Sequence, residues 1–228
     1  MMDWQAFELS FLLAAVTLVI LTPLSLLLAY AFVRWPFPGK TLLEAIVTFP
    51  LILPPTVLGY GLLALFGEAT PLGSLYKAVT GRGLAFSFDG LVVASLIVNL
   101  PFAILPVRRA FAAIPQHIRE AAASCGARPW RVLCDIDIPL ALPGILTAGF
   151  MTFAHTMGEF GVVVMIGGNI PGVTRTAALA IYDKVQRFDD HGATVMALAL
   201  LAISISAMVG ASLFFARPFE GKSKAEIL

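Results

Sequence analysis

The feature that most constrains this chain is a series of long stretches without a charged residue. Five occur among its 228 residues, at 9–33, 45–66, 90–107, 138–158 (with His155 neutral) and 192–216. A helix of about 20 apolar residues crosses the hydrocarbon core of a bilayer. Long apolar runs without alternation also argue against a membrane β-barrel. With 59% hydrophobic and 13% charged residues, the sequence predicts an all-α integral membrane protein with about five transmembrane helices.

The distribution of lysine and arginine predicts how these helices are oriented. With five spans and the N-terminus outside, ten of the 15 basic residues fall on one side and five on the other. The ten are Arg34, Lys40, Arg108, Arg109, Arg119, Arg128, Arg131, Arg217, Lys222 and Lys224. The five are Lys77, Arg82, Arg175, Lys184 and Arg187. Cytoplasmic loops carry the excess of basic residues. We therefore expect an external N-terminus, a cytoplasmic C-terminus and one membrane domain over residues 1–228.

Helix-breaking residues interrupt three of the apolar stretches. They are Pro50, Pro54 and Pro55 in the second, Asn99 and Pro101 in the third, and Gly158 and Gly161 around Glu159 in the fourth. Broken helices are tolerated in lipid where the backbone is buried in protein or lines a watery cavity. Three breaks favour a translocation pathway over plain packing. The predicted pathway or gate residues are Pro54, Pro55, Gly158, Glu159, Phe160 and Gly161.

Residues 112–139 form a polar stretch between two apolar runs, on the side predicted to be cytoplasmic. Pro115 suits the first turn of a short helix, the run REAAA has high helix propensity, and Gly126 suits the position after the helix. A second short element begins at Trp130 and is expected to end at Pro139, where the next span begins. The pattern predicts a helix-turn-helix at the membrane surface that a partner protein can contact.

The spacing of Glu120-Ala121-Ala122, Gly126, Ile136 and Ile138-Pro139 resembles the EAA loop of permease subunits from ABC importers. The family pattern has leucine before the final proline, where this chain has isoleucine. The resemblance implies a coupling helix that docks on a separate ATPase subunit and transmits its motion to the spans. The residues it assigns to ATPase coupling are Glu120, Ala121, Ala122, Gly126, Arg131, Ile136 and Pro139.

Further segments narrow the resemblance to one branch of these permeases. Permeases of molybdate importers are similar to this chain at FPGK (37–40), FPLILPPTVLGYGLL (49–63), GEFG (158–161) and NIPGVTRT (169–176). Sulfate importer permeases also carry a Gly-Glu-aromatic-Gly segment, so a sulfate or thiosulfate permease is the alternative. The resemblance implies a permease that carries molybdate, with tungstate, across the bacterial cytoplasmic (inner) membrane.

The chemistry of such transport requires an energy source outside this chain. A dianion that enters a negative cell is opposed by about 2.3 kcal/mol per charge per 100 mV. The chain has no GxxxxGK[ST] phosphate loop, so we expect ATP and Mg²⁺ to be bound by a partner ATPase. The chain itself is then a transport subunit and not an enzyme. Cys125, Cys134 and His117 match no zinc spacing, and neither a metal nor a cofactor is expected in this chain.

The resemblance also implies the partners of the chain. They are a second copy of itself, two ATP-binding subunits on the cytoplasmic side and an extracytoplasmic molybdate-binding protein, all at a lipid membrane and without nucleic acid. A self-sufficient secondary anion transporter is the alternative from a different class. It would need buried ionisable residues for ion coupling, and Glu159 and Glu44 are the candidates.

Two charged residues have predicted roles near the pathway. A carboxylate in an anion pathway repels its cargo, so Glu159 is expected to accept backbone hydrogen bonds at the helix break, or to pair with an arginine, and to hold the gate. Arg175 is expected at the external mouth or against the binding protein, with Thr174 and Thr176 as hydroxyl donors. Asn169 belongs to the same predicted external segment.

Overall fold

The computed structural model describes the backbone of residues 2–219 and the side chains of residues 2–209. The described range is helical, without a β-strand. Its elements are α1 (Trp4–Arg34), α2 (Lys40–Thr48), η1 (Phe49–Leu51), α3 (Pro55–Phe66), α4 (Pro71–Thr80), α5 (Phe88–Ala113), α6 (Gln116–Ser124), α7 (Pro129–Val132), η2 (Leu133–Asp137), α8 (Ile138–Gly158), α9 (Gly161–Gly167), α10 (Ala177–Gln186) and α11 (Asp190–Phe219). The C-terminus, Lys222, Lys224 and the side chain of Arg217 lie outside the described part.

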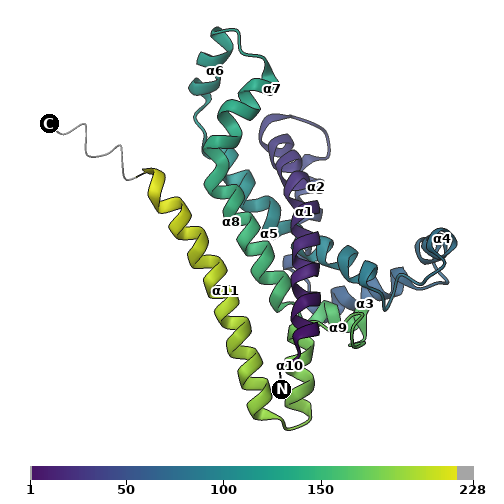
Figure 1. Ribbon diagram of the computed structural model, residues 1–228. Coiled ribbons are helices and arrows are strands. Elements are labelled where there is room, and N and C mark those ends of the chain that lie inside the picture. Colours follow the sequence, from purple (N-terminus) through teal and green to yellow (C-terminus); the bar gives the residue numbers. More distant parts are fainter. Residues whose placement is uncertain (1, 220–228) are drawn as a thin grey trace.

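Four helices in the described range are long and apolar enough to cross a membrane. They are α1, α5, the continuous segment Pro129–Gly158 and the Asp190–Val209 part of α11. In Figure 1, α6, α7 and the C-terminal end of α1 lie at one end of the molecule, whereas the N-terminal end of α1 and α10 lie at the other. These opposite ends agree with the predicted topology, while the orientation of the termini in a membrane stays a prediction.

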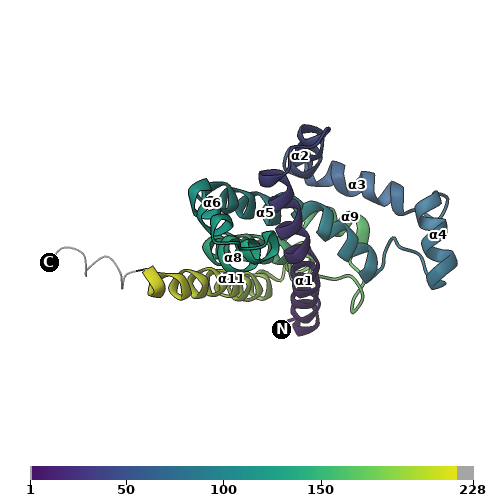
Figure 2. The same cartoon turned by 90° about the horizontal axis from the view of Figure 1, so that it is seen from above.

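The second apolar stretch forms a bent pair of helices. The segments Lys40–Leu51 and Pro55–Phe66 meet at an angle of 111°, so this stretch adds a fifth span only if the pair is taken together. Pro54 has an extended ψ of 134° directly before Pro55, because a proline disfavours helical geometry in the residue before it. The predicted break at Pro54 and Pro55 is confirmed. Figure 2 shows α3 and α4 extending to one side of the central helices, with α11 on the other.

The break predicted in the third apolar stretch is wrong, because α5 continues without interruption past Asn99 and Pro101, and also past Pro106. A proline inside a helix removes one hydrogen bond and bends the helix, but tertiary packing can hold both halves in line. Here α5 packs between α1 and α8, and Ala103, Ile104 and Val107 are fully buried. The packing of this central helix therefore outweighs the local tendency of Pro101 to end it.

The end predicted for the second cytoplasmic element is also wrong. α7 passes through η2, a π-helical turn, directly into α8, so the element does not stop at Pro139. Pro139 is the second residue of α8 and has no N–H to donate to the preceding turn. The wider π-helical turn directly before it accommodates this missing donor. The second cytoplasmic element and the span that follows it therefore form one continuous helical segment.

Candidate coupling surface and translocation pathway

The short helix α6 is built as its sequence predicts. Ile114, buried at the end of α5, anchors its start, and Pro115 occupies the N-cap position. Gly126 has a φ of +80°, a left-handed conformation that glycine adopts without steric cost. With this turn, the N–H groups of Gly126 and Ala127 donate to the carbonyls of Ala123 (2.9 Å) and Ala122 (3.0 Å). The role of Gly126 as helix terminator is confirmed.

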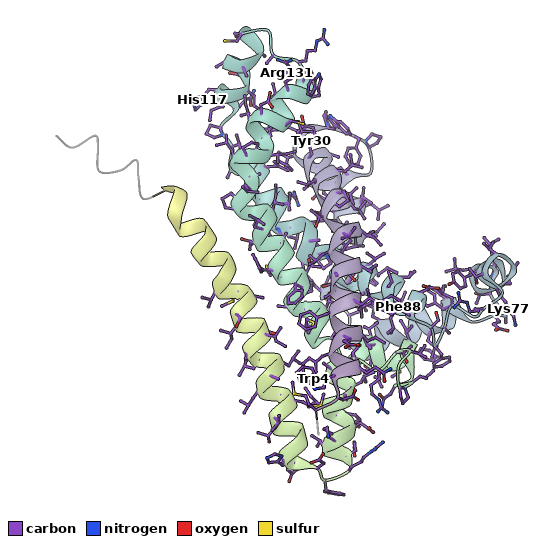
Figure 3. The ribbon with its side chains drawn as sticks, in the orientation of Figure 1. Trp4, Tyr30, Lys77, Phe88, His117 and Arg131 are labelled. Atoms are coloured by element: carbon purple, nitrogen blue, oxygen red, sulfur yellow. The ribbon has the colours of Figure 1, made fainter. Side chains whose placement is uncertain are left out.

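The outer face of α6 and α7 is exposed. No side chain of α6 is fully buried, and among the described residues the carboxylate of Glu120 makes only an intrahelical hydrogen bond, from Gln116 at 2.8 Å. The guanidinium of Arg131 lies 5.5 Å from the ring centre of Trp130, and the Arg131 side chain stands at this end in Figure 3. An open hollow of about 560 Å³ is lined by Cys125, Gly126, Ala127, Arg128, Trp130, Arg131, Val132, Asp135 and Ile136.

The predicted coupling residues therefore lie at one end of the molecule, but their side chains differ in solvent exposure. Glu120, Ala121, Gly126 and Arg131 are exposed, Ala122 and Ile136 are half-buried, and Pro139 is exposed on α8. The hollow brings Gly126, Arg131 and Ile136 together. A surface of this kind, polar at its edge with a half-buried apolar floor, suits docking to another protein. Its contact with an ATPase stays a prediction.

Two of the predicted helix breaks meet in the structure. α9 begins at Gly161 and packs against α3, which begins at Pro55. A methyl group on Gly161 would lie 2.7 Å from Cβ of Pro55, whereas one on Gly158 would meet no atom within 4 Å. Close approach at Gly161 therefore joins two segments that are more than 100 residues apart in the chain. Pro54 and Pro55 themselves are exposed.

Glu159 and Phe160 separate α8 from α9, and Glu159 is extended, with φ of −65° and ψ of 124°. Its Oε1 accepts a hydrogen bond from the N–H of Val162 at 3.1 Å, so the expected backbone hydrogen bond is present. Its Oε2 lies 3.5 Å from Nε2 of His155. The ionisable partner is therefore a histidine and not the arginine that the sequence offered as the other option. Phe160 packs on Tyr182 of α10, with ring centres 4.9 Å apart.

A chain of polar contacts that the sequence did not reveal continues from His155 into the bundle. Nδ1 of His155 lies 3.1 Å from Oδ1 of Asn99, and Nδ2 of Asn99 donates to the carbonyl of Ser95 at 2.8 Å. Thr17 on α1 donates to Oγ of Ser95 at 3.1 Å. These contacts satisfy polar groups inside an apolar bundle, where an unpaired one is unfavourable. The available signal was the spacing of four residues between Ser95 and Asn99, and between His155 and Glu159.

The prediction that Thr174 and Thr176 act as free hydroxyl donors is wrong. Both side chains are buried. Oγ1 of Thr174 donates to the carbonyl of Gly167 at 2.6 Å and accepts from the N–H of Ile170 at 2.9 Å. Oγ1 of Thr176 caps α10 by accepting from the N–H of Leu179 at 3.5 Å. Both hydroxyls shape the loop, and neither is presented to an anion.

Arg175 is held in a network of acceptors at the end of the molecule that carries the N-terminus. Its Nε donates to Oδ1 of Asn169 at 2.9 Å, and its terminal nitrogens lie 3.9 Å from Asp3 and 3.6 Å from Asp183. The structure therefore brings Asn169 and Arg175 together. Because two carboxylates face this guanidinium, its field on a passing anion is weakened.

The N-terminal end of α11, next to this network, is fixed by Asp189. Its carboxylate accepts from Lys184 at 2.8 Å and from the N–H of Gly192 at 2.9 Å. The hydrogen bond from Lys184, followed by that from Gly192, holds the pKa of the Asp189 carboxyl below its usual value. The ionised carboxylate is favourable at the start of a helix, so this contact fixes the turn between α10 and α11.

The fold is shared with chains of solved ABC transporters. The chain is similar to a chain in a bacterial ABC transporter that imports the acidic polysaccharide alginate, with a TM-score of 0.77, 15% identity, and coverage of 94% of this chain and 79% of that one. It is also similar to a chain of the MetNI methionine ABC transporter, with a TM-score of 0.67, 17% identity, and coverage of 92% and 91%.

The sequence then gives the family. Residues 8–218 match the family described as binding-protein-dependent transport system inner membrane component, and the chain belongs to this family. It is 43% identical to the molybdenum transport system permease protein ModB of Azotobacter vinelandii, over 82% of this chain and 83% of that protein. It is 35% identical to the ModB protein of Escherichia coli K12, over 89% and 90%. A probable sulfate transport system permease protein of Chlorokybus atmophyticus is 32% identical, over 81% and 64%.

Family membership has direct consequences for the alternatives. The chain is a multi-pass membrane protein and a transport component, not an enzyme. The family description names dependence on a binding protein, and the chains of similar fold come from ABC transporters, so ATPase and substrate-binding partners are implied and a self-sufficient secondary transporter is disfavoured.

Proposed function

We propose that the chain is the transmembrane permease of an ATP-driven importer for molybdate, with tungstate as a second cargo, in the bacterial cytoplasmic membrane. The observation that carries this proposal is the 43% identity to a molybdenum transport permease over 82% of the chain. The similarity to a sulfate permease is lower, at 32%, and covers only 64% of that longer protein. Sulfate is therefore the second candidate cargo.

In this proposal α6 docks on the ATPase subunit. Glu120, Ala121, Ala122, Gly126, Arg131, Ile136 and Pro139 form or support the docking surface. The exposed face of α6 supports this role, because a helix with no fully buried side chain gains stability by packing against a partner. Closure of the ATPase pair then moves α6, and the movement passes into the spans through the junctions of α6 with α5 and of α7 with α8.

The pathway is proposed to pass the junction of α3 and α9. Pro54, Pro55, Gly158, Glu159, Phe160 and Gly161 lie at or beside this junction. The first turns of α3 and α9 meet at this junction. They can move apart while both helices keep their internal hydrogen bonds. The Glu159 carboxylate is occupied by Val162 and His155, which reduces its repulsion of an anion. Selectivity is assigned to the binding protein and not to this junction.

The proposed assembly contains two copies of this chain, two ATPase subunits and an extracytoplasmic molybdate-binding protein. Each copy presents one coupling helix and therefore contacts one ATPase. ATP and Mg²⁺ are bound by the ATPase subunits. The binding protein docks at the opposite end, where Arg175 contacts Asn169 and lies close to Asp3 and Asp183.

A strain that lacks this gene tests the cargo. Because passive entry of a dianion is opposed by the membrane potential, we expect cellular molybdenum at nanomolar supply to collapse. High external molybdate is expected to restore it, with uptake of labelled sulfate intact. Molybdenum is measured by mass spectrometry beside the sulfate uptake. Normal molybdenum with lost sulfate uptake would reject molybdate and assign the chain to sulfate transport.

Glu159→Gln is expected to leave the order of preference among molybdate, tungstate and sulfate unchanged. The amide oxygen of glutamine can still accept from Val162, and only the charge facing His155 is lost. The measurement is competition between these anions for uptake by cells that carry the variant. The variant Glu159→Ala removes the acceptor as well and is expected to lower uptake of all anions alike. A change of preferred anion in Glu159→Gln would show that this carboxylate selects the cargo.

A further inference from the structure

The buried carboxylate of Asp137 lies where the coupling helix meets two of the spans. Its side chain is 0% exposed, and it ends the π-helical turn η2 between α7 and α8. Its Oδ1 accepts a hydrogen bond from Nε of Arg119 at 2.6 Å and lies 3.5 Å from a terminal nitrogen of Arg34. Arg34, Arg119 and Asp137 thus form a buried ion-pair cluster. Asp137 is 103 positions from Arg34 and 18 positions from Arg119 in the chain.

Each member of the cluster comes from a different element. Arg34 is the last residue of α1, Arg119 lies on α6 directly before Glu120, and Asp137 leads into α8. Arg119 also donates to the carbonyl of Phe111, near the end of α5, at 3.3 Å. One carboxylate therefore connects the coupling helix to α1 and α8, and one guanidinium connects it to α5. All three elements belong to the central group of helices (Figure 1).

The cluster is the polar part of a junction that is otherwise weakly packed. No side chain of α6 is fully buried, whereas Ile114 and Val132 in its flanking segments are buried. A buried charge that loses its partner is strongly unfavourable, because neither water nor a counter-charge then solvates it. Arg119 and Asp137 are therefore expected to move together when α6 is displaced.

The cluster also has unused hydrogen-bonding capacity. Oδ2 of Asp137 and Nε of Arg34 are buried polar atoms without a hydrogen-bond partner among the described residues. One is an acceptor and the other a donor, and they belong to side chains already in contact. A shift of α6 or of the end of α1 could pair these two atoms and so give the junction a second arrangement. A junction with two discrete arrangements can carry coupling between distant sites.

We propose that Asp137 is a positioning residue for transport, which transmits displacement of α6 to α1 and α8 through Arg119 and Arg34. This inference rests on the proposed function, since it requires that α6 is moved by an ATPase. Asp137 touches neither the cargo nor ATP. Its effect is on the number of anions moved for each ATP hydrolysed and not on either binding event.

The experiment compares variants of the complete importer, reconstituted with its ATPase subunits and binding protein in lipid vesicles. The readout is molybdate taken up per ATP hydrolysed. Asp137→Asn keeps the shape of the side chain but removes the charge that holds two arginines, and is expected to lower this ratio about fivefold or more while ATP hydrolysis continues. Glu44→Gln is the matched control, because Glu44 pairs with Arg108 of α5 at 3.1 Å, and no ion pair joins it to α6 among the described residues.

The outcomes separate this inference from the proposed function. Absence of molybdate uptake by the wild-type importer would overturn the proposed function itself. A working wild-type importer with an unchanged ratio in Asp137→Asn, or with an equal loss in Glu44→Gln, would overturn the role of Asp137 alone. If Asp137→Asn does not assemble, Arg119→Lys decides by the same ratio. It keeps the positive charge but loses the Nε geometry and the contact with Phe111, and an unchanged ratio there would also reject the inference.

Discussion

Glu120→Lys is expected to abolish molybdate uptake while the chain remains folded and inserted in the membrane. Glu120 is exposed and makes only a hydrogen bond from Gln116 within its own helix, so the fold loses almost nothing by its replacement. On the docking surface, however, lysine reverses the charge presented to the ATPase. Like charges placed together across an interface cost several kcal/mol, about enough to lower affinity a thousandfold.

The measurement is uptake of labelled molybdate, together with co-purification of the ATPase subunit. Glu68→Lys is a matched control, because it makes the same change on an exposed glutamate, paired with Lys77 at 2.5 Å, away from α6. Lys77 is labelled on the outlying α4 in Figure 3. The control is expected to retain both uptake and the ATPase. Normal uptake by Glu120→Lys would remove the assignment of α6 as the coupling helix.

Gly161→Ala is expected to lower the stability of the folded chain by about 1 to 3 kcal/mol, as overpacking does, and to reduce transport. The added methyl group would lie 2.7 Å from Cβ of Pro55 and 3.6 Å from backbone atoms of Pro55 and Thr56. Pro55 is a rigid residue at the start of α3, so it cannot rotate away. The beginning of α9 or of α3 must move instead, and their junction is the proposed pathway.

Gly158→Ala tests the same substitution at the other side of the break. A methyl group there meets no atom within 4 Å, so little change in stability is expected. Thermal unfolding in detergent of the two variants, beside molybdate uptake, provides the comparison. Equal melting temperatures for both variants would mean that α3 and α9 do not approach each other at Gly161, and that the proposed junction is wrongly placed.

The sequence predicted the elements whose cause is local. A stretch of about 20 uncharged residues must be helical to satisfy its backbone in lipid, so four of the five predicted spans could be placed from the sequence, and the second stretch forms a bent pair of helices. Gly126 ends α6 because the residue itself permits a φ of +80°. Pro54 and Pro55 separate two helices because Pro55 directly follows Pro54 and disfavours helical geometry there, so that Pro54 has a ψ of 134°. In each case the reason lies within a few residues of the feature.

Features that depend on neighbours distant in sequence were not predictable in this way. Pro101 was also expected to break a helix, yet α5 continues through it, with α1 and α8 packed against it. Thr174 and Thr176 looked like free donors beside Arg175, but the fold uses both hydroxyls to shape the loop and cap α10.

Tertiary structure alone decided which charges are neutralised and by which partners. The spacing of Arg34, Arg119 and Asp137 in the chain gives no sign that they meet, and only the packing of α1, α6 and α8 buries them together. The same holds for the approach of Gly161 to Pro55. Helical geometry is fixed by hydrogen bonds between near neighbours, which a sequence shows directly. Long-range contacts depend on how whole helices pack, and that is decided by all of their surfaces at once.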